Sequence, residues 1–243
     1  MMKPPLGSMI EPGHPLSRGL VLCLLMNEGA GTRIHDISGN NNHGVLTNGP
    51  LWKPGRDGAA VAFPGVNGGG YVLYPQIWSG TTFTVLIWIY PKTPTKTYCS
   101  VLTQATTAGI FLRGSAGGAK NLFVDVYFSA APHNNNTPLT DNALNLFGLS
   151  VLSGSGIYYL NGRADGTVSN VVTMGFSLSG NDASNESLSG LISSVSIYNR
   201  ALSAQEVADL YINPYAFIHQ PRKYWLMPQG GMVPPHLLFR RAA

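Results

Sequence analysis

The sequence predicts an all-β fold in which two antiparallel sheets pack face to face as a sandwich. Short apolar segments recur at the spacing typical of sandwiches, and 29 glycines and 17 prolines among 243 residues supply frequent turns. Only 11% of the residues are charged, and a helical pattern occurs once, close to the end of the chain. A chain of this length can form one domain with a substantial core.

Ten segments have the composition of strands and alternate with Gly- and Asn-rich turns. They are residues 20–26, 59–63, 71–73, 81–90, 98–103, 122–128, 144–152, 156–160, 168–173 and 191–198. Asn161-Gly162 directly follows one of them and favours the positive φ angles of a type I′ hairpin turn. In residues 83–91, both the odd-numbered and the even-numbered positions are largely apolar, and Trp88 lies on the face opposite Phe83. We therefore expect a central strand that is covered on both faces.

The segment after the last predicted strand has the pattern of a short helix. Ser203 and Glu206 have the spacing of a capping box, in which each side chain binds a backbone N–H of the other residue. Val207 and Leu210 follow at helical spacing, and Pro214 prevents a long continuation. We therefore expect one short helix at the end of the domain.

Several motifs resemble those of the concanavalin A-like (laminin G-like) jelly-roll superfamily, in particular its stand-alone members from tailed bacteriophages and bacteria. The matching segments are 19–29 (GLVxxxxxNEG), 36–44 (DxSGNxNxG), 58–65 (GxAxxFxG), 83–91 (FTVxxWIYP) and 190–203 (GxIDxVxIYNRALS). Ser193 stands where the last motif usually has an acid. The resemblance covers about residues 18–212, and it implies a two-sheet antiparallel jelly-roll sandwich with one short C-terminal helix and extended terminal arms.

The charges divide the chain into a neutral domain and a basic tail. The formal net charge is +4, and the basic residues after Asp209, the last acid, account for all of it. We therefore expect an extended N-terminal arm (1–17), a laminin G-like jelly-roll domain (18–212) and a basic, aromatic, Pro-rich C-terminal arm (213–243).

The distribution of acids argues against glycoside hydrolysis, the activity of the superfamily's glucanases. That chemistry needs two carboxyl groups flanking the scissile bond, about 5–5.5 Å apart in retaining enzymes. The four glutamates, at 11, 28, 186 and 206, do not form the ExDxxE pattern of the glucanase branch, and Asp125 is the lone acid on a central-looking strand. The six histidines lack metal-site spacing, and no nucleophile motif is present. We expect no catalytic residue, no cofactor-binding residue and no enzyme activity.

Calcium is the one cofactor that the resemblance leaves open. Laminin G-like domains often hold this ion at the rim of the sandwich, and Asp36 and Asn40 are the candidate ligands by resemblance. The alternative is an Asx-type turn, in which the Asp36 carboxylate accepts nearby backbone N–H groups. The missing acid at Ser193 favours the turn, so we expect no metal site.

Exposed aromatic side chains are the candidates for glycan binding. Trp52, Tyr74 and Trp78 lie close together in sequence and could line a groove. The alternative is that these aromatic rings belong to the core, as large aromatics in sandwiches commonly do.

The tail contains residues typical of protein interfaces. These are Tyr215, Phe217, Arg222, Lys223, Tyr224 and Trp225. They either attach the domain to another subunit or pack back over an edge of the sandwich itself. Four basic residues give a small footprint compared with strong nucleic-acid binders, so no nucleic-acid partner is expected.

By resemblance to stand-alone phage proteins, we expect a non-catalytic virion structural protein. It would be a capsid decoration or tail-associated subunit that attaches through its arms to other virion proteins or to copies of itself. The alternative is a soluble, lectin-like carbohydrate-binding module, extracellular or on a cell surface, that binds host-surface glycan; a degenerate glucanase ranks third. Apolar runs are too short for membrane insertion, and Cys23 and Cys99 are expected to be free thiols.

Overall fold

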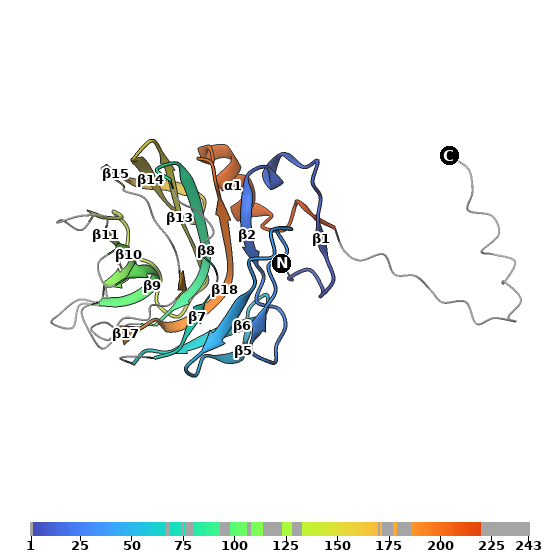
Figure 1. Ribbon diagram of the computed structural model, residues 1–243. Helices are drawn as coiled ribbons and strands as arrows, with labels where there is room; N and C mark the ends of the chain where they lie inside the picture. The colour runs from blue at the N-terminus through green and yellow to red at the C-terminus, as the bar shows by residue number, and fades with distance from the viewer. Residues whose placement is uncertain are drawn as a thin grey trace, which may run out of the picture.

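The computed structural model describes residues 2–66, 69–73, 75, 80–92, 98–105, 108–113, 123–127, 133–169, 171, 177–178 and 186–219. Within these residues, two sheets pack face to face, with one α-helix and the terminal segments against one of them (Figure 1). The two-sheet sandwich expected from the sequence is confirmed.

The first sheet has eight strands in the order β15-β14-β13-β8-β18-β6-β5, with β2 beside β18. Their bounds are β2 (Leu20–Leu24), β5 (Leu51–Gly55), β6 (Gly58–Pro64), β8 (Phe83–Pro91), β13 (Asn145–Leu152), β14 (Ser155–Leu160), β15 (Arg163–Val168) and β18 (Ser189–Tyr198). All of their pairings are antiparallel, and β8 and β18 lie at the centre.

The second sheet has nine strands in the order β12-β11-β10-β9-β16-β7-β4-β3, with β17 beside β9. Their bounds are β3 (Arg33–Ile34), β4 (Gly44–Thr47), β7 (Tyr71–Leu73), β9 (Tyr98–Ala105), β10 (Ala108–Arg113), β11 (Phe123–Tyr127), β12 (His133–Asn134), β16 (Ser177–Leu178) and β17 (Glu186–Ser187). Only the pairing of β17 with β9 is parallel.

Strand β8 has one apolar face in each of two cores. Phe83, Val85, Ile87 and Ile89 belong to the core between the sheets, as the period-two pattern predicted. Leu86 and Trp88 point the other way, into a second apolar cluster on the outer face of the eight-stranded sheet. Burying a large apolar side chain stabilises the fold by about 1.5–3 kcal/mol, so this strand contributes strongly to both layers.

The outer face is covered by residues from both ends of the described chain. Strand β1 (Met9–Ile10) pairs with β19 (Ile218–His219), and a 3₁₀ turn η1 (Pro15–Ser17) and helix α1 (Ala204–Ile212) lie over the same sheet. Figure 1 shows β1 and α1 on the side of β18 that faces away from β9, β10 and β11. We call residues 3–19 and 213–219 together the terminal strap. The expected N-terminal arm is thus part of the layer that covers this sheet.

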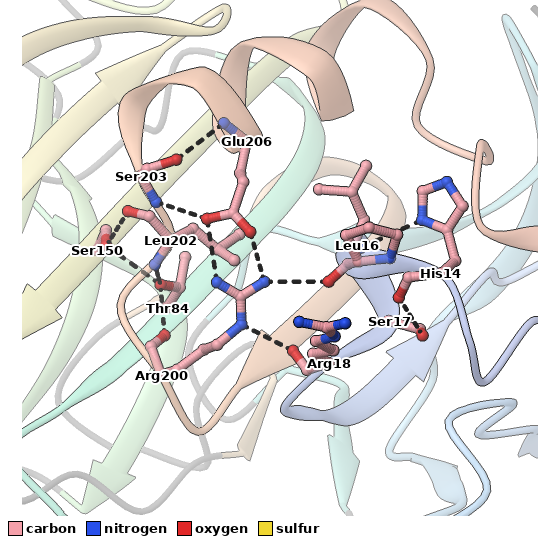
Figure 2. A network of polar contacts seen from close by, with 11 residues as sticks. His14, Leu16, Ser17, Arg18, Thr84, Ser150, Arg200, Leu202, Ser203 and Glu206 are labelled. Atoms are coloured by element: carbon pink, nitrogen blue, oxygen red, sulfur yellow. Dashed lines mark hydrogen bonds and ion pairs between the residues drawn. The ribbon is translucent and has the colours of Figure 1, made fainter.

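A polar network joins the start of α1 to the strap and to the sheet (Figure 2). The Arg200 guanidinium donates to both carboxylate oxygens of Glu206, at 3.0 and 2.6 Å, and to the Arg18 carbonyl at 2.8 Å. Ser203 and Glu206 form the predicted capping box. The Thr84 hydroxyl on β8 donates to the Arg200 carbonyl at 2.8 Å. The helix is therefore held to the sheet by polar contacts as well as apolar ones.

Nine of the ten predicted strands agree with observed strands to within two residues, and the tenth differs at a hairpin. Several observed strands, among them β4, β5 and β10, lie outside the predicted segments. Asn161 and Gly162 have φ angles of +50° and +80°, which confirms the type I′ pattern. A two-residue turn requires the next strand to start at once, so β15 spans Arg163–Val168, whereas the sequence predicted a strand at 168–173. Cys23 and Cys99 are both buried and do not form a disulfide with each other, as expected. Within the described ranges, no helix has the length and apolar character needed to span a membrane.

Replacing Glu206 tests the cap and its dependence on pH. The hydrogen bonds from Arg200 hold the pKa of the Glu206 carboxyl below its usual value, so its stabilisation is present above about pH 4.5 and is lost as the pH falls through the folded value. We expect Glu206→Gln to lower the free energy of unfolding at pH 7 by about 1 kcal/mol, as for other caps. Urea unfolding from pH 3 to 7 measures this. Glu11→Gln, on the strap, is the control; equal effects of the two variants would contradict the assignment.

Candidate functional site

A groove of about 320 Å³ lies on the outer face of the eight-stranded sheet, between α1, the strap and the β5–β6 turn. The residues that line it are Arg56, Asp57, Trp88, Leu144, Tyr211, Ile212, Pro214 and Tyr215. It combines three aromatic side chains with two charged ones. Pockets for small ligands have this composition, with apolar walls and a few polar groups that fix orientation.

The aromatic part of the groove is a stacked pair. Trp88 points outward from β8 and Tyr211 comes from the last turn of α1; their ring centroids are 5.7 Å apart and their planes differ by 11°. Gly162 in the β14–β15 turn lies against Tyr211, because a Cβ on this glycine would be 2.8 Å from the Tyr211 Cβ. Tyr211 remains 39% exposed. The β14–β15 turn therefore packs against Tyr211, and part of Tyr211 stays open to solvent.

The polar part of the groove is the two-residue turn between β5 and β6. The Arg56 backbone N–H donates to the Tyr90 hydroxyl at 2.7 Å, and the Lys3 backbone N–H donates to the Asp57 carbonyl at 2.9 Å. The Asp57 side chain accepts hydrogen bonds from the hydroxyls of Ser193 at 2.7 Å and Tyr215 at 2.9 Å. The turn is therefore fixed to the sheet and to both segments of the strap.

The Lys3 ammonium lies close to this turn in a ring of backbone carbonyls. It donates to the carbonyl oxygens of Met26 at 3.3 Å, Ser193 at 2.6 Å and Ala59. Burial lowers the pKa of Lys3 to about 8, while the negative charges of Asp57 and Glu28 act in the opposite direction. Lys3 therefore remains mostly protonated at pH 7. Ser193 connects it to Asp57, since the carbonyl accepts from the ammonium and the hydroxyl donates to the carboxylate.

The Asp36 loop, the candidate calcium site of the sequence, has the geometry of the Asx-type turn. One carboxylate oxygen accepts from the backbone N–H groups of Cys23 at 2.8 Å and Ser38 at 2.9 Å. The other accepts from the Asn42 N–H at 2.9 Å and the Ser38 hydroxyl at 2.8 Å. The Asn40 side chain also donates to the Ser38 hydroxyl, at 3.0 Å. Within the part of the chain that the structure describes, no group of three or more His, Cys, Asp or Glu side chains could hold a metal ion.

The glycan candidates of the sequence do not include the groove aromatics. Trp52 packs against the core between the sheets and donates its indole N–H to the Gly31 carbonyl at 2.8 Å, and it does not line the groove. Tyr74 and Trp78 lie outside the described residues. Trp88 could have been found from the alternation of side chains along β8, which places this tryptophan on the face opposite the main core.

Two of the tail residues are used inside the domain. Phe217 is 1% exposed and belongs to the outer apolar cluster, and Tyr215 binds Asp57. Residues 213–219 thus pack back over the sandwich, the alternative that the sequence left open. The other attachment candidates, Arg222, Lys223, Tyr224 and Trp225, lie outside the described residues.

A second pocket, of about 370 Å³, lies between the first residues of the strap and the loop around Asp36. Several of its polar groups bind one another, whereas one carboxylate oxygen of Glu28 is buried without a hydrogen-bond partner among the described residues. Glu28 accepts from the His35 backbone N–H at 2.7 Å, and the His43 ring accepts from the Asp36 N–H at 3.1 Å. The first groove is lined by Trp and Tyr side chains, which are missing from the described lining of this pocket, so the first groove is better suited to pack against a flat apolar face of a ligand.

This chain is similar to many solved structures, among them the following three. Domain 4 of an extracellular arabinanase from Geobacillus stearothermophilus, in complex with arabinotriose, is 20% identical with a TM-score of 0.63, and the match covers 79% of this chain and 98% of that one. The binding domain of Paraclostridial mosquitocidal protein 1 is 19% identical (TM-score 0.61; 83% and 53%), and Trypanosoma rangeli sialidase is 16% identical (0.61; 82% and 33%). The chain thus spans about half and a third of the latter two.

At these identities, the similarity to solved structures establishes the fold alone. A comparison with curated proteins finds no match. A family model described as the concanavalin A-like lectin/glucanases superfamily matches residues 64–208, which is more than half of the sequence. This match and the two-sheet architecture agree, and the chain belongs to the concanavalin A-like lectin/glucanase superfamily.

Proposed function

We propose that this protein is a non-catalytic carbohydrate-binding module whose ligand lies in the groove beside α1. The observation that carries the proposal is the stacked Trp88–Tyr211 pair, which lines the same groove as the charged turn Arg56-Asp57. Sugar rings have apolar C–H faces that pack on aromatic side chains, while their hydroxyl groups need hydrogen-bond partners. The groove offers both kinds of contact side by side.

The size of the groove favours a short saccharide. Its volume of about 320 Å³ is at the low end of the range for ligand pockets, roughly 300–1,000 Å³. The strap closes one side through Pro214 and Tyr215, and α1 closes another. We infer recognition of one or two sugar residues or of a chain end.

The groove residues support binding without hydrolysis. Cleavage of a glycosidic bond needs a second carboxyl group across the bond from the first. Asp57 is the one carboxylate among the described residues that line the groove, and its oxygens already accept two hydroxyl hydrogen bonds. The absence of enzyme activity thus remains part of the proposal.

The similarity to a domain solved with arabinotriose agrees with this proposal by analogy. One fold supports many functions, so the argument depends on the groove and not on the neighbour.

The virion role expected from the sequence stays a prediction. It is compatible with sugar binding, since a lectin-like sandwich displayed on a particle can recognise glycan on a host surface. Because residues 213–219 cover the domain's own sheet, attachment would fall to residues after 219. A virion or an extracellular location likewise stays a prediction, as does the expected absence of a cofactor, to which calcium is the open alternative.

Replacing Tyr211 tests the proposed function. We expect the wild-type protein to bind saccharides saturably on a glycan array. Tyr211→Ala should lower the affinity for the tightest-binding saccharide at least tenfold, because half of the stacked pair is lost. Isothermal titration calorimetry measures the affinities. Trp52→Phe is the matched control and should bind like the wild type. Absence of any saccharide binding by the wild type, or full affinity of Tyr211→Ala, would refute the proposal.

Replacing Gly162 tests whether the position of Tyr211 matters. An alanine here has an unfavourable φ of +80°, and its Cβ would collide with Tyr211, so the ring should move away from Trp88. We expect Gly162→Ala to cost about 1 kcal/mol of stability and to weaken saccharide binding. Gly154→Ala, at φ +83° with its nearest neighbour at 3.4 Å, has similar backbone strain without this collision. Near-UV circular dichroism and calorimetry compare the two variants; equal saccharide affinities would count against a positional role.

A further inference from the structure

The two charged residues of the groove differ in how far their charges are balanced. Asp57 is 7% exposed, and both of its oxygens accept hydrogen bonds, from Ser193 and Tyr215. The Lys3 ammonium interacts electrostatically with it and binds the carbonyl of the same Ser193. The negative charge of Asp57 is therefore stabilised by two hydroxyl donors and by the nearby Lys3 ammonium.

Arg56 has no such compensation. Its side chain is exposed, and within the described residues no carboxylate forms an ion pair with it. Its backbone is held by the hydroxyl of Tyr90, and that of the adjacent Asp57 by the N–H of Lys3. The groove thus carries an exposed arginine on a turn whose backbone is fixed.

We propose that the groove selects an acidic saccharide, with Arg56 binding a carboxylate of the sugar while the Trp88–Tyr211 pair contacts its ring. This inference rests on the proposed function and names its ligand class. A planar guanidinium can donate two parallel hydrogen bonds to a carboxylate, which a neutral sugar cannot match in strength. The two hydroxyl donors on Asp57 and the nearby Lys3 ammonium weaken the repulsion that an acidic ligand would otherwise meet.

The arrangement favours a sugar acid over an acidic peptide. The pair of aromatic rings lies in the same groove of about 320 Å³ as the guanidinium, which suits one rigid ring bearing one carboxylate. An extended acidic peptide would need a row of basic groups, and Arg56 is the only basic residue among the described residues that line the groove.

The experiment compares acidic saccharides with their methyl esters, which keep the sugar but remove the charge. An array carries oligosaccharides of uronic and sialic acids, each beside its ester, together with neutral oligosaccharides and a Glu-rich peptide. For the acidic saccharide that binds most tightly on the array, calorimetry at low ionic strength then measures the affinities of the acid and of its methyl ester. We expect the acid to bind at least tenfold more tightly than its ester, and added salt to reduce the difference.

Two variants assign the preference to Arg56. Arg56→Gln should bind acid and ester equally, while the control Lys53→Gln, an exposed charge on the same hairpin that does not line the groove, should keep the wild-type ratio. Lys3→Gln should lower the affinity for the acid more than that for the ester, because Asp57 loses its counter-charge. The acid-to-ester ratio separates this effect from a general loss of stability.

The outcomes distinguish the two levels of the proposal. If esters or neutral sugars bind as tightly as acids, or if Arg56→Gln keeps the preference, the acidic ligand is wrong and the carbohydrate-binding function stands. If no saccharide of any charge binds, the proposed function fails and this inference fails with it. If the Glu-rich peptide binds as tightly as the sugar acids and through Arg56, the ligand is an acidic peptide instead.

Discussion

The structure depends on the need to cover both faces of the eight-stranded sheet. The central strands β8 and β18 carry apolar side chains toward the nine-stranded sheet and also toward the outside. A single facing sheet can bury only one of these surfaces. The terminal strap and α1 bury the other, and the groove forms where this second layer is incomplete, between the helix and the β5–β6 turn. The same apolar surface thus accounts for the extra layer and for the candidate site.

Local patterns in the sequence predicted the elements whose structure is determined locally. The capping box at Ser203, the turn at Asn161-Gly162 and the two-faced strand at 83–91 depend on neighbouring residues and were found as expected. Strand β5 was not predicted, because Lys53 and Pro54 give it a polar, exposed pattern that only an edge strand tolerates.

The groove could not be predicted, since it joins residues near positions 56, 88 and 211, which only the sheet order brings together. The sequence did place Trp88 on the face opposite the main core. It could not show that the last turn of α1 would put Tyr211 against that ring. In the same way, no pattern in the sequence indicated that Lys3 would bind the carbonyl of Ser193. Ser193 is the position at which the sequence departs from the family motif.

Strand β1, near the start of the chain, pairs with β19, which contains the last described residues. Residues from both ends of the described chain therefore lie at one side of the molecule. His219 lies in the strap, on the outer side of the eight-stranded sheet that also carries the groove. A label attached at the exposed His219 would therefore lie on the groove side of the molecule and would leave the nine-stranded sheet uncovered.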